Sequence, residues 1–388
     1  MTEAAAPKTR RHPSDRTLDF LQQARPATPC LIVDLDIVAE SYQRLQACLP
    51  ASRIFYAVKA NPAKDVIARL ADLGSSFDLA SEGEIERCLS LGLAPYRLSF
   101  GNTIKTKTAI AMAFAKGIRL FAFDSDGELD KIAQAAPGAR VFCRILANSK
   151  FADWPLTRKF GCDVIMAAAL LRKARHLGLV PAGISFHVGS QQREPHAWDE
   201  PIRHAAHLFT KLAQYGIELE FLNLGGGFPG HYRGEVPAIE VYAEAIDASL
   251  KTHFGSSRPQ IIVEPGRYLV ADAGFLASQV ILVAKKSHRA RHRWVYADAG
   301  RFNGLIETLD NRILYELWCE RASSPLEPAF LSGPTCDSTD IIFRPRDCAL
   351  PVDLGCGDAI GFLSAGAYTA SYASVEFNGF PPLKTYCI

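Results

Sequence analysis

Residues 54–58 read IFYAV, a short apolar run rich in aromatic and β-branched side chains, and Lys59 follows it directly. The next segment has apolar residues at helical spacing, Val66, Leu70 and Leu73. The pattern predicts a buried strand followed by a helix packed against it. The same alternation recurs along the chain, and the strands expected from it are 54–58, 76–79, 97–100, 118–123, 140–146, 182–187, 219–224 and 260–264. Eight strand–helix units in this length predict an α/β fold, a (β/α)8 TIM-like barrel over residues 35–270.

The alternation ends near residue 270. Beyond that point short strand-like runs are separated by Gly and Pro, and few helical periods remain, so residues 271–388 are expected to form an all-β domain. Residues 28–34 precede the barrel and are expected to pair into this β domain. Residues 1–16 are expected to be a polar tail.

Composition excludes several classes of protein. Of 388 residues 48% are hydrophobic and 22% charged, as in ordinary globular proteins, and 43 basic against 41 acidic side chains leave a net charge of +2. This balance provides no excess of positive charge that would indicate binding to nucleic acid or to an anionic membrane. No apolar run is long enough for a membrane span or a signal peptide, so we expect a cytoplasmic location. The ten cysteines include no C-x-x-C pair, and no metal site is predicted.

Charged and glycine residues follow the predicted strands, where the active site of such a barrel forms. Three glycines can close backbone N–H groups around an anion, and a lysine that ends an apolar strand can form a Schiff base. The pattern therefore indicates a phosphate-bearing cofactor bound through a lysine. The residues at this rim are Lys59, Asp78, Glu84, Arg144, His187, Ser190, Gly225–Gly227, Glu264 and Arg267.

Each of these residues also has a structural interpretation. The glycines could form a flexible turn, Asp78 could be a turn residue, and Arg144 could be an ion-pair partner. Glu84 lies three residues after Ser81, which is the spacing of a helix capping box.

Six motifs together resemble a known family. They are YAVKAN at 56–61, FDLAS at 77–81, FHVGS at 186–190, GGGF at 225–228, EPGR at 264–267 and GPTCD at 333–337. The chain is similar to the ornithine/diaminopimelate/arginine decarboxylases, which are fold-type III pyridoxal 5'-phosphate (PLP) enzymes, and most of all to the bacterial ornithine decarboxylases. The resemblance runs from about residue 28 to the C-terminus.

The resemblance implies a role for each matching residue. Lys59 would bind the cofactor covalently, His187 would stack on its ring, and Glu264 would pair with the pyridine nitrogen. Asp78, Glu84 and Arg144 would organise Lys59 and His187. The phosphate would be held by Ser190, Gly226, Gly227, Arg267 and Tyr368.

Two further residues are implied to act on the substrate. Cys336 would return a proton after carbon dioxide leaves, and Asp337 would bind the distal ammonium group. The family's Cys-Asp segment enters the other subunit's site, which implies a homodimer with active sites at the subunit interface. Cys336 could instead be an inert thiol.

The implied reaction is decarboxylation of L-ornithine to putrescine in polyamine biosynthesis, with L-lysine, giving cadaverine, as a further substrate. Asp337 favours ornithine, but Tyr315-Glu316 stands where the family commonly has Tyr-Asp. With Tyr368, these residues are the expected substrate contacts. Lysine, arginine and meso-diaminopimelate stay open as substrates. An amino-acid racemase and an inactive regulatory homologue are the alternatives to a decarboxylase.

Overall fold

The computed structural model describes residues 12–156, 158–321 and 323–388. Most of the expected polar tail, residues 1–11, lies outside these ranges. Residues 15 and 16, the end of that tail, instead begin helix α1 (Asp15–Ala24), because the Ser14 side chain caps its first turn by accepting from the Thr17 amide. The described chain divides into two compact units, Leu35–Ala271 and a unit that combines residues up to Asp34 with Asp272–Ile388.

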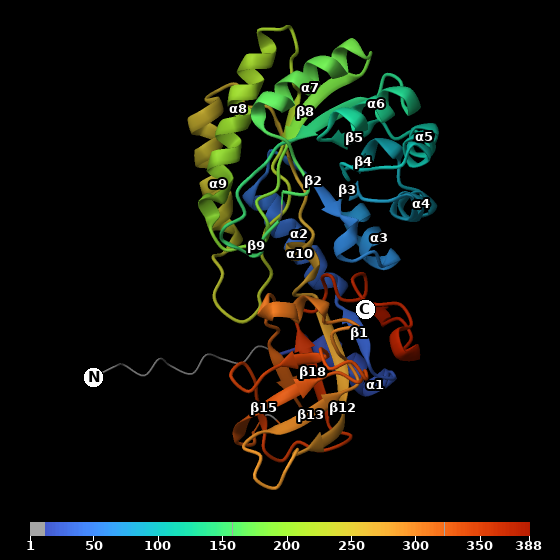
Figure 1. Ribbon diagram of the computed structural model, residues 1–388, viewed down its shortest axis with the longest axis vertical. Helices are drawn as coiled ribbons and strands as arrows, with labels where there is room; N and C mark the ends of the chain where they lie inside the picture. The colour runs from blue at the N-terminus through green and yellow to red at the C-terminus, as the bar shows by residue number, and fades with distance from the viewer. Residues whose placement is uncertain (1–11, 157, 322) are drawn as a thin grey trace, which may run out of the picture. The chain divides into compact units, whose positions relative to one another are not determined.

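The first unit is a closed barrel of eight parallel strands ringed by helices, which confirms the predicted fold (Figure 1). The barrel strands are β2 (Ser52–Ala57), β3 (Ser76–Leu79), β4 (Leu98–Phe100), β5 (Leu120–Phe123), β6 (Arg140–Arg144), β8 (Val180–Ser185), β10 (Phe221–Asn223) and β11 (Gln260–Val263). Each overlaps one expected strand. The barrel closes where β11 pairs with β2, with Val263 opposite Ile54.

Helices and short turns flank and connect the barrel strands. They are α2 (Leu35–Cys48), α3 (Lys64–Asp72), α4 (Glu82–Ser90), α5 (Lys107–Ala115), α6 (Asp126–Ala135), α7 (Val164–His176), α8 (Asp199–Ala213), α9 (Ile239–Phe254), α10 (Arg267–Val270), and the 3-10 turns η1 (Val58–Ala60), η2 (Pro95–Arg97) and η3 (Pro195–Trp198). Two short strands that the sequence did not reveal, β7 (Ala152–Trp154) and β9 (Ser190–Gln192), pair antiparallel outside the barrel.

Side chains fill the barrel interior, as they do in barrels of this size. The packed layer consists of Phe55, Ala122, Phe142, Ala182, Phe221 and Ile262, all almost fully buried. The rings of Phe142 and Phe221 meet edge to face with centroids 5.6 Å apart. Gly183 is required beside them, because a Cβ at this position would lie 2.6 Å from the Phe221 ring.

The second unit is built on a nine-stranded sheet, consistent with the predicted all-β domain. Its elements are α1, β1 (Cys30–Val33), β12 (Gly274–Ala284), β13 (Arg293–Ala297), β14 (Leu317–Cys319), β15 (Leu326–Ser332), β16 (Ile341–Phe343), β17 (Ala349–Pro351), β18 (Ala359–Leu363), β19 (Lys384–Cys387), and the turns η4 (Ile306–Asn311) and η5 (Phe377–Gly379). Strand β1 pairs antiparallel with β12 and parallel with β19, so the segment before the barrel belongs to this sheet.

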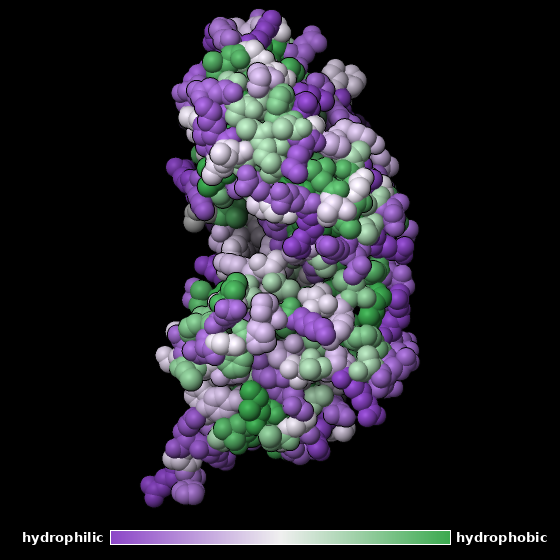
Figure 2. All heavy atoms as spheres, turned by 90° about the vertical axis from the view of Figure 1, so that its right-hand side faces the viewer, coloured by the Kyte–Doolittle hydropathy of each residue, from purple (hydrophilic) through white to green (hydrophobic). Residues whose placement is uncertain are grey.

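On the face shown in Figure 2, hydrophilic and hydrophobic residues are interspersed. None of the helices in the described ranges combines the length and apolar character that a bilayer span needs.

The barrel core generates a stability prediction. In Gly183→Ala the added methyl group would lie 2.6 Å from both the Phe221 ring and the Phe221 carbonyl oxygen, so ring and backbone must shift, and overpacking of this kind costs about 1–3 kcal/mol. We expect a lower midpoint of thermal unfolding. The matched control is Gly127→Ala on α6, where a Cβ meets nothing within 4 Å and alanine favours the helix. An unchanged midpoint for Gly183→Ala would show that the core is looser than described.

Candidate active site

The candidate site forms where the carboxyl ends of the barrel strands meet. Lys59 lies in turn η1, directly after β2. The Tyr56 hydroxyl donates to the Asn61 carbonyl at 2.9 Å, and the Ala57 amide donates to the Pro265 carbonyl at 3.1 Å. The first bond braces the turn that carries Lys59, and the second attaches that turn to the segment directly after Glu264.

Glu264 follows β11 and is held by Asn223, the last residue of β10. The Asn223 side-chain amide donates to Glu264 Oε1, while Asn223 Oδ1 accepts from the Gly225 amide at 2.9 Å. Burial raises the pKa of Glu264, and the bond from Asn223 and the charges of Lys59 and Arg144 oppose that rise. The sequence did not single out Asn223; its only signal is a polar side chain at a strand end beside the glycines.

Asp78 on β3 is buried, and among the described residues its Oδ1 has no hydrogen-bond partner. Burial and the charge of Glu264 raise its pKa well above the ordinary value, against the opposing charges of Lys59 and Arg144. A Cβ at Gly101 would lie 1.8 Å from this oxygen, so only glycine fits there. An orphaned, buried carboxyl oxygen is typical of a functional site.

The hydrogen bonds of Glu84 form half of the capping box, because its carboxylate accepts from the amide before the N-cap and not from the N-cap amide itself. Ser81 caps α4 by accepting from the Glu84 amide at 3.3 Å, and Glu84 Oε2 accepts from the Ala80 amide at 2.7 Å. Burial nonetheless raises the pKa of Glu84, and the charge of Lys59 lowers it, so the carboxyl group also belongs to the electrostatic environment of Lys59.

Arg144 ends β6, and its guanidinium carbon lies 5.4 Å from the centroid of the Phe160 ring. His187 lies two residues beyond the end of β8, and its Nδ1 accepts from the Gly189 amide at 3.0 Å. Burial and the charges of Arg144 and Lys59 lower the pKa of His187 well below its usual value. The imidazole is therefore neutral, with its proton on Nε2.

The three glycines form a cradle with no room for side chains. A Cβ atom would lie 2.2 Å from the Phe186 carbonyl oxygen at Gly225, 2.6 Å from the Glu264 carbonyl oxygen at Gly226, and 2.7 Å from the Gly189 carbonyl oxygen at Gly227. Gly225 and Gly227 also have positive φ, +66° and +109°, which excludes an unstrained side chain.

Two of the side chains expected to bind phosphate contact each other in the barrel unit. Arg267 is almost fully buried at the start of α10, and its Nε and Nη2 donate to Ser190 Oγ at 3.2 and 3.1 Å. Glycine backbone, a hydroxyl group and a guanidinium are the donors that protein sites use for phosphate.

Cys336 and Asp337 lie in the β unit, on an exposed turn between β15 and β16. The buried Asp340 carboxylate organises this turn by accepting from the Thr335 amide at 3.2 Å and from its hydroxyl at 2.7 Å. Asp337 Oδ1 accepts from the Thr339 hydroxyl and amide at 2.6 and 2.8 Å, which lowers the pKa of Asp337. Asp337 therefore presents an ionised carboxylate to solvent.

The other three predicted residues also belong to the β unit. The Tyr315 ring is fully buried, and its centroid lies 6.3 Å from that of Phe362, a core position. Glu316 accepts from the Leu363 amide through its backbone carbonyl at 2.9 Å. Tyr368 has φ +57°, in a turn where the Thr369 hydroxyl donates to the Ala365 carbonyl. Substrate contacts by these residues stay predictions.

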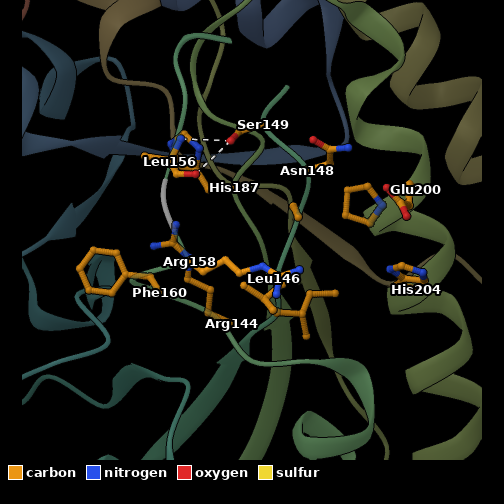
Figure 3. Close-up of a pocket in the computed structure, with 13 residues that line it drawn as sticks. Arg144, Leu146, Asn148, Ser149, Leu156, Arg158, Phe160, His187, Glu200 and His204 are labelled. Carbon is orange, nitrogen blue, oxygen red and sulfur yellow. Dashed lines mark hydrogen bonds between the residues drawn. The ribbon is translucent and has the colours of Figure 1, made fainter. Parts of the chain in front are cut away.

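A cavity of about 490 Å³ lies beside Arg144 and His187 in the barrel unit (Figure 3). Residues 144–149, 156, 158 and 160 line one side, and Glu200 and His204 of α8 line the other. Ser149 Oγ exchanges hydrogen bonds with the Leu156 amide and carbonyl, both at 3.1 Å, which closes part of this segment into a loop.

The fold and the site define a (β/α)8-barrel enzyme with a lysine and a glycine cradle at the carboxyl ends of its strands. Residues 35–271 match the family model for the pyridoxal binding domain of the pyridoxal-dependent decarboxylases. The chain belongs to this family, and its cofactor is PLP.

Similar proteins cover almost the whole chain. A lysine/ornithine decarboxylase of Selenomonas ruminantium is 35% identical over 95% of this chain and 91% of its own length. The crystal structure of SrLDC in complex with PLP and cadaverine has a TM-score of 0.88 and 33% identity, covering 98% of this chain and 95% of that one. Antizyme inhibitor 2 of Xenopus laevis is 33% identical over 94% of this chain and 82% of its own length.

The neutral state of His187 generates a pH prediction. The folded barrel disfavours protonated His187, whereas an unfolded histidine binds a proton below about pH 6.5. The stability that His187 contributes is therefore lost as the pH falls below that value, by at most about 1.4 kcal/mol per pH unit. The raised pKa values of Asp78, Glu84 and Glu264 make the folded protein more stable as the pH falls, which opposes the effect of His187. That contribution is present in the wild type and in a His187 variant alike.

We expect the thermal midpoint of the cofactor-free protein to fall more between pH 7.5 and pH 5.5 in the wild type than in His187→Gln. The control is His176→Gln, at the exposed end of α7. Equal losses in the wild type and in His187→Gln would contradict a neutral, buried His187.

Proposed function

We propose that this protein decarboxylates L-ornithine to putrescine and carbon dioxide, as a step of polyamine biosynthesis, with L-lysine as a second substrate that gives cadaverine. The observation that carries the choice of a diamino acid is the ionised Asp337 carboxylate, adjacent to Cys336 on an exposed turn. A carboxylate is the natural partner of the distal ammonium group that ornithine and lysine share. The similarity to a lysine/ornithine decarboxylase supports the same substrates.

In this proposal the barrel holds the cofactor. Lys59 binds it covalently, Glu264 pairs with its ring nitrogen, and neutral His187 stacks on its ring face. Its phosphate is bound by Ser190, Gly226, Gly227 and Arg267 of the barrel unit. When bound, PLP supplies an electron sink for the carbon–carboxylate bond that breaks. The site fits this group, because the glycine cradle is kept clear of side chains and Asp78 has a buried oxygen with no partner in the described ranges.

The chain's own residues then orient the substrate and move one proton. Asp78 and Arg144 set the electrostatic balance around Lys59, since each changes the pKa of neighbouring groups. Asp337 holds the distal ammonium group, and the Cys336 thiol delivers a proton to the α-carbon after carbon dioxide departs. We propose that the Cys336 turn serves the site of the other subunit, so that the functional enzyme is a homodimer.

Two observations keep other functions in view. Tyr315-Glu316 stands where ornithine enzymes commonly have Tyr-Asp. Because glutamate is longer than aspartate, the length of the substrate slot does not by itself select ornithine. Lysine, arginine and meso-diaminopimelate therefore also need to be tested as substrates. The similarity to antizyme inhibitor 2 raises the regulatory homologue as the second candidate. The presence of Lys59, Cys336 and the glycine cradle favours catalysis over a regulatory role, and it leaves the racemase as the remaining alternative.

The first test measures carbon dioxide release by the PLP-loaded protein with ornithine, lysine, arginine and meso-diaminopimelate offered separately. We expect release from ornithine, weaker release from lysine, and none from Lys59→Ala. Lys64→Ala, at the start of α3, is the matched control and should be fully active. Asp337→Asn should raise the KM for ornithine about tenfold or more, because a charged hydrogen bond is lost. Bound cofactor without release from any substrate would refute the decarboxylase.

The second test addresses the shared site. Lys59→Ala and Cys336→Ala proteins should each be inactive alone, because one lacks the cofactor lysine and the other the proton donor. When the two are mixed and allowed to exchange subunits, a site with Lys59 from one chain and Cys336 from the other becomes complete, and part of the activity should return. A mixture that forms mixed dimers by mass spectrometry yet stays inactive would show that each site is built from one chain.

A further inference from the structure

A buried tyrosine of the barrel unit contacts the guanidinium group that is proposed to bind phosphate. Arg267 Nη1 donates to the Tyr232 hydroxyl at 2.8 Å, and the Arg267 guanidinium carbon lies 5.6 Å from the centroid of the Tyr232 ring. Tyr232 is 5% exposed. The contact is therefore both a hydrogen bond and a cation–π interaction, in a place that water barely reaches.

Tyr232 lies in the segment between the glycine cradle and α9, and Gln191 holds this segment in place. Gln191 Nε2 donates to the Gly230 carbonyl at 2.7 Å, and the Gly230 amide donates back to Gln191 Oε1 at 3.0 Å. Gln191 is completely buried and has φ +55°, a left-handed conformation that costs a non-glycine residue free energy. The two hydrogen bonds compensate for that strain.

Gly230 is tightly enclosed. A Cβ there would lie 2.7 Å from the Ala271 Cβ and 3.6 Å from both Arg267 Cγ and Tyr232 Cε2. The segment thus packs directly on the residue whose guanidinium group it contacts.

The contacts form a closed ring. Ser190 is bonded in the chain to Gln191, Gln191 clamps Gly230, and Gly230 precedes Tyr232 by two residues. Tyr232 accepts from Arg267, and Arg267 donates back to Ser190. Ser190 and Arg267, which are distant in sequence, therefore keep a fixed mutual geometry before any ligand binds. Such preorganisation reduces the entropy lost when an anion is bound.

We propose that Tyr232 is a positioning residue for the phosphate group of the cofactor, acting through Arg267, and that Gln191 supports it through Gly230. The inference rests on the proposed assignment of Ser190 and Arg267 to the phosphate. It predicts a specific loss: without the Tyr232 hydroxyl the site recognises phosphate less well, whereas recognition of the pyridine ring is unaffected.

The test compares the affinity of the cofactor-depleted protein for pyridoxal 5'-phosphate and for pyridoxal, by absorbance and fluorescence titration. Tyr232→Phe keeps the ring and removes the hydroxyl. We expect its Kd for pyridoxal 5'-phosphate to rise about tenfold and its Kd for pyridoxal to stay unchanged. The matched control is Tyr242→Phe, a fully buried tyrosine of the same unit whose hydroxyl donates to the Gln192 carbonyl at 2.8 Å. Its ratio of the two affinities should equal that of the wild type.

The outcomes separate this inference from the proposed function. If Arg267→Ala keeps the wild-type ratio, the phosphate assignment itself is wrong. Two outcomes would refute only the role of Tyr232. In the first, Arg267→Ala loses the preference for pyridoxal 5'-phosphate over pyridoxal while Tyr232→Phe keeps it. In the second, Tyr232→Phe raises the Kd for both ligands by the same factor. Should Tyr232→Phe fail to fold, Gln191→Met removes the clamp with little change in shape, and it must show the same selective loss.

Discussion

Closure of the barrel between β11 and β2 is the constraint on which the candidate site depends. This pairing joins strands that are about as far apart in sequence as the barrel allows, with Ile261 opposite Ser52. The Ala57 amide then bonds the Pro265 carbonyl, so the turn that carries Lys59 is fixed directly to the residues that follow Glu264. Without closure, the lysine and the carboxylate would belong to opposite edges of an open sheet.

Once the strand ends meet, burial determines the charges. Burial away from water raises the pKa of both Asp78 and Glu264, the charge of Glu264 raises that of Asp78 further, and the two cations Lys59 and Arg144 oppose these rises. The same cations and the same burial keep His187 neutral. Burial and the charges of Lys59 and Arg144 thus act on the pKa of all three groups, Asp78, Glu264 and His187.

Much of the architecture could be predicted from local patterns. The strand-like run at 54–58 and its seven successors each correspond to a barrel strand, because apolar strands buried on both faces have a recognisable composition. The observed strands end earlier than expected where turns intervene. The strand expected at 140–146 ends at Arg144, and the turn η1 separates Lys59 from β2. Strands β7 and β9 escaped notice because three residues are too few to show a period.

The sequence alone determined the barrel, the β domain that follows it, and the set of lysine, carboxylate, histidine and glycine residues at the strand ends, because strand order and side-chain alternation are local properties. Only the tertiary structure showed that Asn223 holds Glu264, that Gly101 makes room for Asp78, and that Gln191 and Tyr232 fix Arg267. These residues act through partners far away in the chain. Their roles follow from hydrogen bonds and steric exclusion in three dimensions, which no spacing along the sequence reveals.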